Sequence, residues 1–134
     1  MRFVKTLTVT AGSTIAEPSE TILRLIRGKL THIEIAFPPG PADYVHVVIV
    51  DGNLQIAPAN PEQSFSWDDF THGFSMNYPI VDQPYELTLV GWSPEAIYDH
   101  NITFRIDIDS TAEDDRQALL ELLSGGFKPF GERG

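Results

Sequence analysis

The chain has 134 residues, 42% of them hydrophobic, and carries nine Lys and Arg against nineteen Asp and Glu, a net charge of −10. This length fits one domain that can bury a core without a metal or a disulfide, and the absence of cysteine excludes disulfide scaffolds, cysteine-based zinc sites and thiol catalysis. No apolar window reaches the ~18 residues of a transmembrane helix, and the threonine-rich N-terminus does not resemble a signal peptide, so we expect a soluble protein that is made in a cytoplasm and not secreted.

The first predicted strand covers residues 3–10, where side chains alternate and threonine and valine favour a pleated surface. A loop with Pro18 follows at residues 13–20. Residues 21–27 fit a short helix face as well as a strand, and we favour the strand.

The densest apolar signal runs from Gly28 to Gly52 and predicts two strands joined by a rigid turn or corner, Pro38-Pro39-Gly40-Pro41. In strand 29–37, the charged neighbours place Thr31 on the inner face and Leu30 on the outer face. The return strand covers residues 44–50. The residues of these two strands that we expect in the core are Ile33, Ile35, Phe37, Val45, Val47 and Ile49.

Asp51-Gly52-Asn53 is typical of a tight hairpin, and residues 54–56 form a short strand after it. Residues 57–71 show no periodicity, so we expect a long loop, which in a compact domain is often functional or part of an interface. A short edge strand at residues 74–81 is broken by Pro79.

Tyr85 to Trp92 and Ile102 to Ile108 are clear strands with a loop at residues 93–101 between them. In the second of these strands, Ile102, Phe104, Ile106 and Ile108 share one face.

The spacing of the apolar residues changes after this strand, from every second position to every third or fourth. A capping pattern at Ser110 and apolar residues at three- and four-residue steps predict an amphipathic helix at 110–124, which Gly125-Gly126 ends. The fold class predicted is all-β: an antiparallel two-sheet β-sandwich, jelly-roll-like, with seven or eight strands and one short C-terminal helix. The domain is expected at 1–109, the helix on or beside it at 110–124, and a tail at 125–134.

The histidines give one expected contact. His32 and His46 fall on the same side of the presumed hairpin as Glu34, so His46 is expected near His32 or Glu34. The strand spacing supplies no third metal ligand.

Two loops combine carboxylates with an imidazole, which can bind a metal or orient a base: Asp68, Asp69 and His72, and Asp99-His100-Asn101. Asp and Asn are also common in loops simply because their side chains form hydrogen bonds with the backbone of turns. No metal motif, glycine-rich phosphate loop or Gly-x-Ser-x-Gly nucleophile is present. We therefore expect no catalytic residue, no metal and no cofactor, and we keep a metal-dependent enzyme that uses the first group as the least favoured hypothesis.

Aromatic residues in or beside loops suit a protein interface or the stacking of a sugar. Trp92, at a strand end, also fits a core position. A carbohydrate-binding module would use Trp67 and Tyr98. The interface candidates are Phe65, Trp67, Phe70, Tyr98, Phe127 and Phe130.

The charge is unevenly spread. No Lys or Arg lies between Lys29 and Arg105, and residues 38–134 carry sixteen acidic residues. A face built from this segment would repel phosphate, so nucleic acid is not an expected partner. The basic residues of the N-terminal part suit an acidic protein surface.

Several turn and core positions resemble those of small β-rich virion proteins of tailed phages and related prokaryotic viruses. They are Gly28 with Ile33-x-Ile35-x-Phe37-Pro38-Pro39-Gly40, Gln55-Ile56-x-Pro58-x-Asn60-Pro61, Gly91-Trp92, and Tyr98-x-His100-x-Ile102-x-Phe104-x-Ile106. The resemblance covers about residues 18–108.

This resemblance implies a capsid decoration or other minor structural subunit of a virion, without a cofactor or a membrane. Its expected partners are itself, in a homo-oligomer with a trimer as one form, and a major capsid or tail protein. The expected location is the virion, after synthesis in the host cytoplasm. A carbohydrate-binding, lectin-like module is the alternative.

Overall fold

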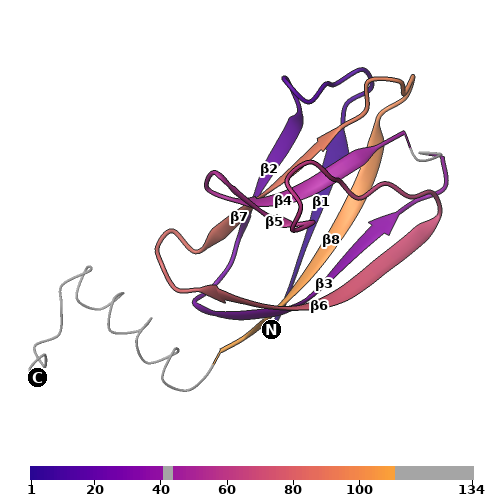
Figure 1. Ribbon diagram of the computed structural model, residues 1–134. Coiled ribbons are helices and arrows are strands. Elements are labelled where there is room, and N and C mark those ends of the chain that lie inside the picture. Colours follow the sequence, from indigo (N-terminus) through magenta and orange to yellow (C-terminus); the bar gives the residue numbers. More distant parts are fainter. Residues whose placement is uncertain (41–43, 111–134) are drawn as a thin grey trace, which may run out of the picture.

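The computed structural model describes residues 1–40 and 44–110, and these form eight strands (Figure 1). The strands are β1 (Arg2–Val9), β2 (Ser19–Arg24), β3 (Gly28–Phe37), β4 (His46–Asp51), β5 (Leu54–Ala57), β6 (Phe70–Ile80), β7 (Glu86–Trp92) and β8 (His100–Asp109). The segment at 21–27 therefore begins as a strand, as favoured. Apart from Ser110, the helix expected at 110–124 and the tail at 125–134 lie outside the described residues.

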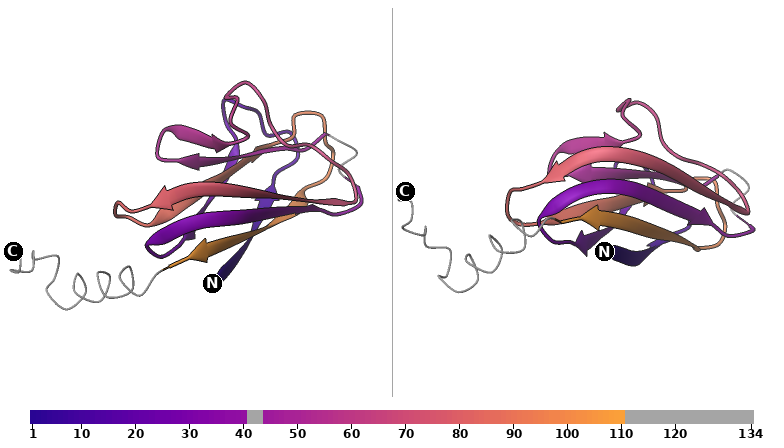
Figure 2. Two further views of the ribbon diagram at one scale, coloured as in Figure 1. Left: turned by 60° about the horizontal axis from the view of Figure 1, so that its bottom comes forward. Right: turned by 90° about the horizontal axis from the view of Figure 1, so that it is seen from below.

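The strands form two antiparallel four-stranded sheets, with the orders β1-β8-β3-β6 and β2-β7-β4-β5. Figure 2 shows β6, β3 and β8 of the first sheet side by side. The pairings are nested along the chain, because β1 pairs with β8, β2 with β7, β3 with β6 and β4 with β5. The pairs β3–β8 and β4–β7 then join these ribbons into sheets.

One apolar core lies between the two sheets and takes side chains from both, as expected for a β-sandwich. The predicted alternation of β8 is confirmed, because its four inward side chains are at most 1% exposed. The six core residues predicted for the strands at 29–37 and 44–50 are all buried, including Val45, which lies just before β4.

Leu30 was expected outside and is fully buried. The registers of β3 with β8 and with β6 both shift between Leu30 and His32. This irregularity moves the alternation by one residue, so that Leu30 and Ile33 both point inward. Thr31, which was expected inside, is only half-buried.

The predicted hairpin between β3 and β4 is wrong. The corner that begins at Pro38 carries the chain from one sheet to the other, and β3 pairs with β6 and β8 instead. The tight turn at Gly52 is confirmed: it joins β4 to β5, and its φ of 61° is one that glycine adopts without strain.

The loop expected at 57–71 is shorter than predicted, because β6 begins at Phe70 and continues through Pro79 to Ile80. Proline is tolerated there because β6 is an edge strand.

The two sheets lie close together at Gly91, where β7 faces β1. A β-carbon at this position would lie 2.7 Å from Val9 Cγ2 and 3.1 Å from Leu7 Cδ2.

Among the described residues, no helix is long and apolar enough to cross a membrane.

Candidate interaction surface between β5 and β6

The side chains of β6 alternate regularly between solvent and the interior of the sandwich. His72, Phe74, Met76 and Tyr78 point inward and are half-buried, whereas the residues between them are exposed. Since β6 lies at the edge of its sheet, its inward side chains form the border of the core on that side.

Phe65 is fixed next to this border by its backbone. Its N–H donates to the carbonyl of Val47 at 2.9 Å and its carbonyl accepts from the N–H of Val47 at 3.0 Å. The segment before β6 is therefore attached to β4 and packs against the core.

Five rings gather here, and we call them the aromatic cluster: Phe65, Trp67, Phe70, His72 and Phe74. The imidazole of His72 stacks on the indole of Trp67 with centroids 4.4 Å apart, and Phe65 lies 5.4 Å from Phe74. Trp67 also meets the buried Phe37 edge-on at 5.9 Å. Such ring pairs stabilise by about 0.5–1.5 kcal/mol beyond the area that they bury. Phe70 remains 48% exposed, so the cluster reaches the surface.

An open groove of about 350 Å³ adjoins the cluster, and we call it the β5–β6 groove. Strand β5 and the chain after it form one wall, and β6 forms the other. Apart from His72 its lining is apolar: Ile56, Ala57, Pro58, Ala59, Phe65, Phe74 and Met76. Cluster and groove together form an apolar surface of the kind that binds another protein.

The acidic residues beside the cluster have structural roles. Asp68 accepts a hydrogen bond from the N–H of Gly40 at 2.8 Å, and the N–H of Asp69 donates to the carbonyl of Pro38 at 3.2 Å. Asp69 has a φ of 50°, a conformation that Asp tolerates better than most residues. Within the two described ranges, no three His, Asp or Glu side chains gather as metal ligands, and the group of Asp68, Asp69 and His72 is not such a site.

The residues of the second loop group make structural contacts, one to a turn and one between β1 and β8. Asp99 accepts from the N–H of Ala11 at 2.9 Å, and Asn101 accepts from the hydroxyl of Thr8 at 2.8 Å. His100 begins β8.

The expected contact of His46 with His32 or Glu34 is wrong, because β3 and β4 belong to different sheets. His32 lies 3.5 Å from Glu34, which also pairs with Arg2 and Arg105 across the outer face of the first sheet. His46 instead bonds the hydroxyl of Ser64 at 3.1 Å and stacks on the half-buried Trp92.

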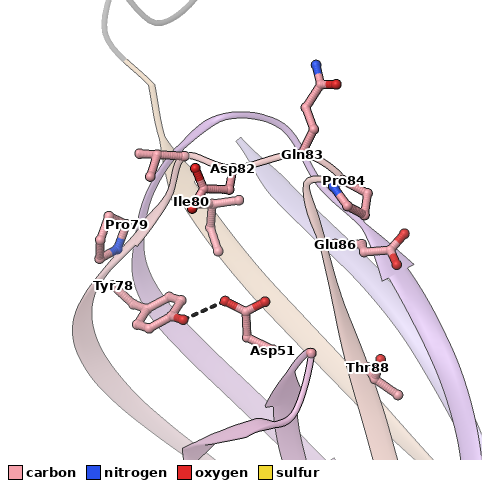
Figure 3. Close-up of a pocket in the computed structure, with 11 residues that line it drawn as sticks. Asp51, Tyr78, Pro79, Ile80, Asp82, Gln83, Pro84, Glu86 and Thr88 are labelled. Carbon is pink, nitrogen blue, oxygen red and sulfur yellow. Dashed lines mark hydrogen bonds between the residues drawn. The ribbon is translucent and has the colours of Figure 1, made fainter.

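A second cavity, of about 420 Å³, lies at the end of β6 (Figure 3). The Tyr78 hydroxyl donates to Asp51 across it at 2.5 Å. Burial of the phenol, followed by the hydrogen bond to Asp51 and its charge, raises the pKa of Tyr78 to about 12. Asp82 and Glu86 add to the acidic lining.

Of the six interface candidates, the structure brings together Phe65, Trp67 and Phe70. Tyr98 is 70% exposed in the loop between β7 and β8, and it makes none of the ring contacts of the aromatic cluster. Phe127 and Phe130 lie outside the described residues.

Sequence reasoning did not place the β6 residues His72, Phe74 and Met76 on this surface. His72 was considered only as a possible metal ligand in a loop, and Phe74 and Met76 were assigned to a broken strand. The signal was present as alternation from Phe70 to Ile80, but glycine and proline within the segment concealed it. No protein-family model matches the chain, and no curated protein matches its sequence significantly.

Proposed function

We propose that the protein is a structural subunit of a virus particle, of the capsid-decoration type, which acts by binding other protein surfaces and catalyses no reaction. The observation that carries this proposal is the aromatic cluster beside the β5–β6 groove. Three residues of the cluster were selected from the sequence as interface candidates, and they lie together on one side of the sandwich.

We also propose that the fold is a jelly roll. The nested pairs β1–β8, β2–β7, β3–β6 and β4–β5 describe one long ribbon, and the pairs β3–β8 and β4–β7 describe how that ribbon is rolled into two sheets. Eight-stranded jelly rolls occur in viral capsid and lectin domains. The fold alone does not decide between these functions.

The virion setting rests on the resemblance of the turn and core positions between residues 18 and 108. A carbohydrate-binding module is the second candidate, because lectins share the jelly roll. We rank it lower because His72 stacks on the Trp67 ring and occupies one face that a sugar would use, and because Tyr98 lies outside the aromatic cluster.

The test is sedimentation of native extracts in which the chain is expressed, with the chain followed by mass spectrometry across the gradient. We expect it to sediment with particles. A chain that remains only at the top of the gradient, as a small protein, would contradict the virion proposal.

Rebinding of purified variants to stripped particles tests the surface itself. Phe70→Ser removes an aromatic side chain that is 48% exposed, and Ile22→Ser on β2 is a matched control, since Ile22 is 44% exposed outside the cluster. Rebinding should fall by about tenfold or more with Phe70→Ser, as for an interface hot spot, and remain with Ile22→Ser. Equal rebinding of both variants would contradict the role of the cluster, and glycan binding that Trp67→Ala abolishes would favour the lectin.

A further inference from the structure

Strand β6 has one free side. In the order β1-β8-β3-β6, its only neighbour among the described strands is β3, so the backbone N–H and C=O groups along its other side have no strand to pair with. At eleven residues it is also the longest described strand. A long unpaired edge is a template for another strand.

This edge carries none of the charges that normally protect an edge. Between Phe70 and Ile80 there is no Asp, Glu, Lys or Arg, although the chain has 28 such residues. The other edges differ: β5 has only four residues, β1 carries Arg2 and Lys5, and β2 carries Glu20 and Arg24. Pro79 blocks donation only near the end of β6, so the run from Phe70 to Tyr78 stays open to pairing.

Between Phe70 and Pro79, which are also exposed, the exposed residues of β6 are small or polar. Thr71, Ser75 and Asn77 lie on the outer face, with Gly73 between them. When an antiparallel strand is paired with a copy of itself, these residues stand opposite one another without like charges. Two molecules that each carry a charge of −10 repel each other over most of their surface, and β6 is a strip on which they can meet without burying a charge.

We propose that two copies of the chain associate by antiparallel pairing of β6 with β6, about a two-fold axis, into one continuous eight-stranded sheet. This contact is isologous, because the same strand serves on both sides. It places the two β5–β6 grooves on the same face of the joined sheet. Because antiparallel pairing sets the start of one β6 against the end of the other, the two aromatic clusters lie toward opposite ends of the pair. The proposal deepens the proposed function and rests on it in one respect, that the molecule works through protein contacts.

The experiment is sedimentation velocity on the full chain over a range of concentrations. The parent chain should be a dimer that dissociates on dilution. Ser75→Lys puts a lysine on the exposed face of β6 and should weaken association by about 10- to 100-fold, because like charges then face each other across the axis. Asn77→Lys repeats the test at a second position, and circular dichroism shows whether each variant keeps the β fold.

Val4→Lys is the matched control. Val4 is 56% exposed on β1, the opposite edge strand of the same sheet, and its substitution should leave the dimer intact. Dissociation by Val4→Lys as well as Ser75→Lys would mean head-to-tail pairing of β1 with β6 and would overturn the two-fold proposal. Three other results would also overturn it. They are a monomer at all concentrations, a trimer, and a dimer whose association is unchanged by both lysine substitutions on β6.

Amide hydrogen exchange distinguishes a second copy of the chain from a segment of the same chain as the partner of the free side of β6. In the dimer, the backbone N–H groups on the free side of β6 should be protected from exchange at high concentration and should lose this protection on dilution. Protection that persists in a monomer would assign the edge to residues 111–134 of the same chain and refute the proposal. Because self-association is measured on the purified chain and particle binding on extracts, either result can fail while the other stands.

Discussion

Substitution of Gly91 by alanine tests how tightly the two sheets are packed. The new β-carbon would lie 2.7 Å from Val9 Cγ2, 3.1 Å from Leu7 Cδ2 and 3.2 Å from the carbonyl oxygen of His46. Carbon atoms in ordinary contact are about 3.5–4.0 Å apart, so the overlap with Val9 is about 1 Å. Val9 and Leu7 are buried and cannot swing into solvent. Overpacking of this kind lowers the free energy of unfolding by about 1–3 kcal/mol.

Thermal and urea unfolding at one fixed protein concentration measure the effect. With an unfolding entropy of about 2.1 cal/mol/K per residue, a loss of 1–3 kcal/mol lowers the Tm of a chain of this length by about 4–11 °C. The control is Gly73→Ala on β6, where the new β-carbon would be 3.4 Å from the partly exposed side chains of Glu34 and His32. We expect that variant to stay within about 1 kcal/mol of the parent chain.

A double-mutant cycle identifies the cause. Val9→Ala removes the methyl group that the new β-carbon meets, so Gly91→Ala should cost less in the Val9→Ala background than alone. A Gly91→Ala chain as stable as the parent, or a cycle without coupling, would refute the close approach of β7 to β1 described above.

Two further predictions concern charged contacts. Burial and the bond to Asp51 give Tyr78 a folded pKa of about 12 against about 10 when unfolded, so its neutral phenol contributes stability that is fully present below about pH 10 and is lost as the pH rises through 12. Urea unfolding at increasing pH should show this alkaline loss in the parent chain but not in Tyr78→Phe, and equal slopes would contradict it. The hydrogen bond from Arg2 holds the pKa of Asp107 below its usual range, so its contribution is present above the unfolded pKa of about 3.9 and is lost as the pH falls through the folded value. The Tm of the parent chain should therefore exceed that of Asp107→Asn at neutral pH and approach it in acid, and a difference that does not depend on pH would contradict the pairing.

The strands with strong alternation could be predicted because the cause is local. In β8, apolar side chains at every second position from Ile102 to Ile108 require one buried face, and all four are buried. The turn at Gly52 is similarly a property of three adjacent residues.

The pairing of strands could not be predicted in the same way. The proline-rich corner after Phe37 looks like the turn of a hairpin, but whether the chain turns back within one sheet or crosses to the other depends on which strands pair with β3. Those partners are β6 and β8, which lie far along the sequence. The register shift after Leu30 is likewise set by these partners, and it reversed the face assigned to Leu30.

The candidate surface was predicted in part. Phe65, Trp67 and Phe70 were selected because large aromatic residues in a loop need an explanation. The groove next to them could not be seen from the sequence, because its walls come from β5 and β6, which do not pair with each other.

The place of β8 has a consequence for synthesis on the ribosome. It pairs with both β1 and β3 in the interior of the first sheet, yet it is the last described strand to be made. Until about residue 109 has emerged, β1 has no partner in its sheet and one edge of β3 is unpaired. Folding with such distant contacts is slow compared with that of helical domains, and translation adds only about 5–20 residues per second. The nascent chain therefore carries apolar strands without their partners for several seconds, and we expect chaperones that bind extended apolar segments to improve its yield.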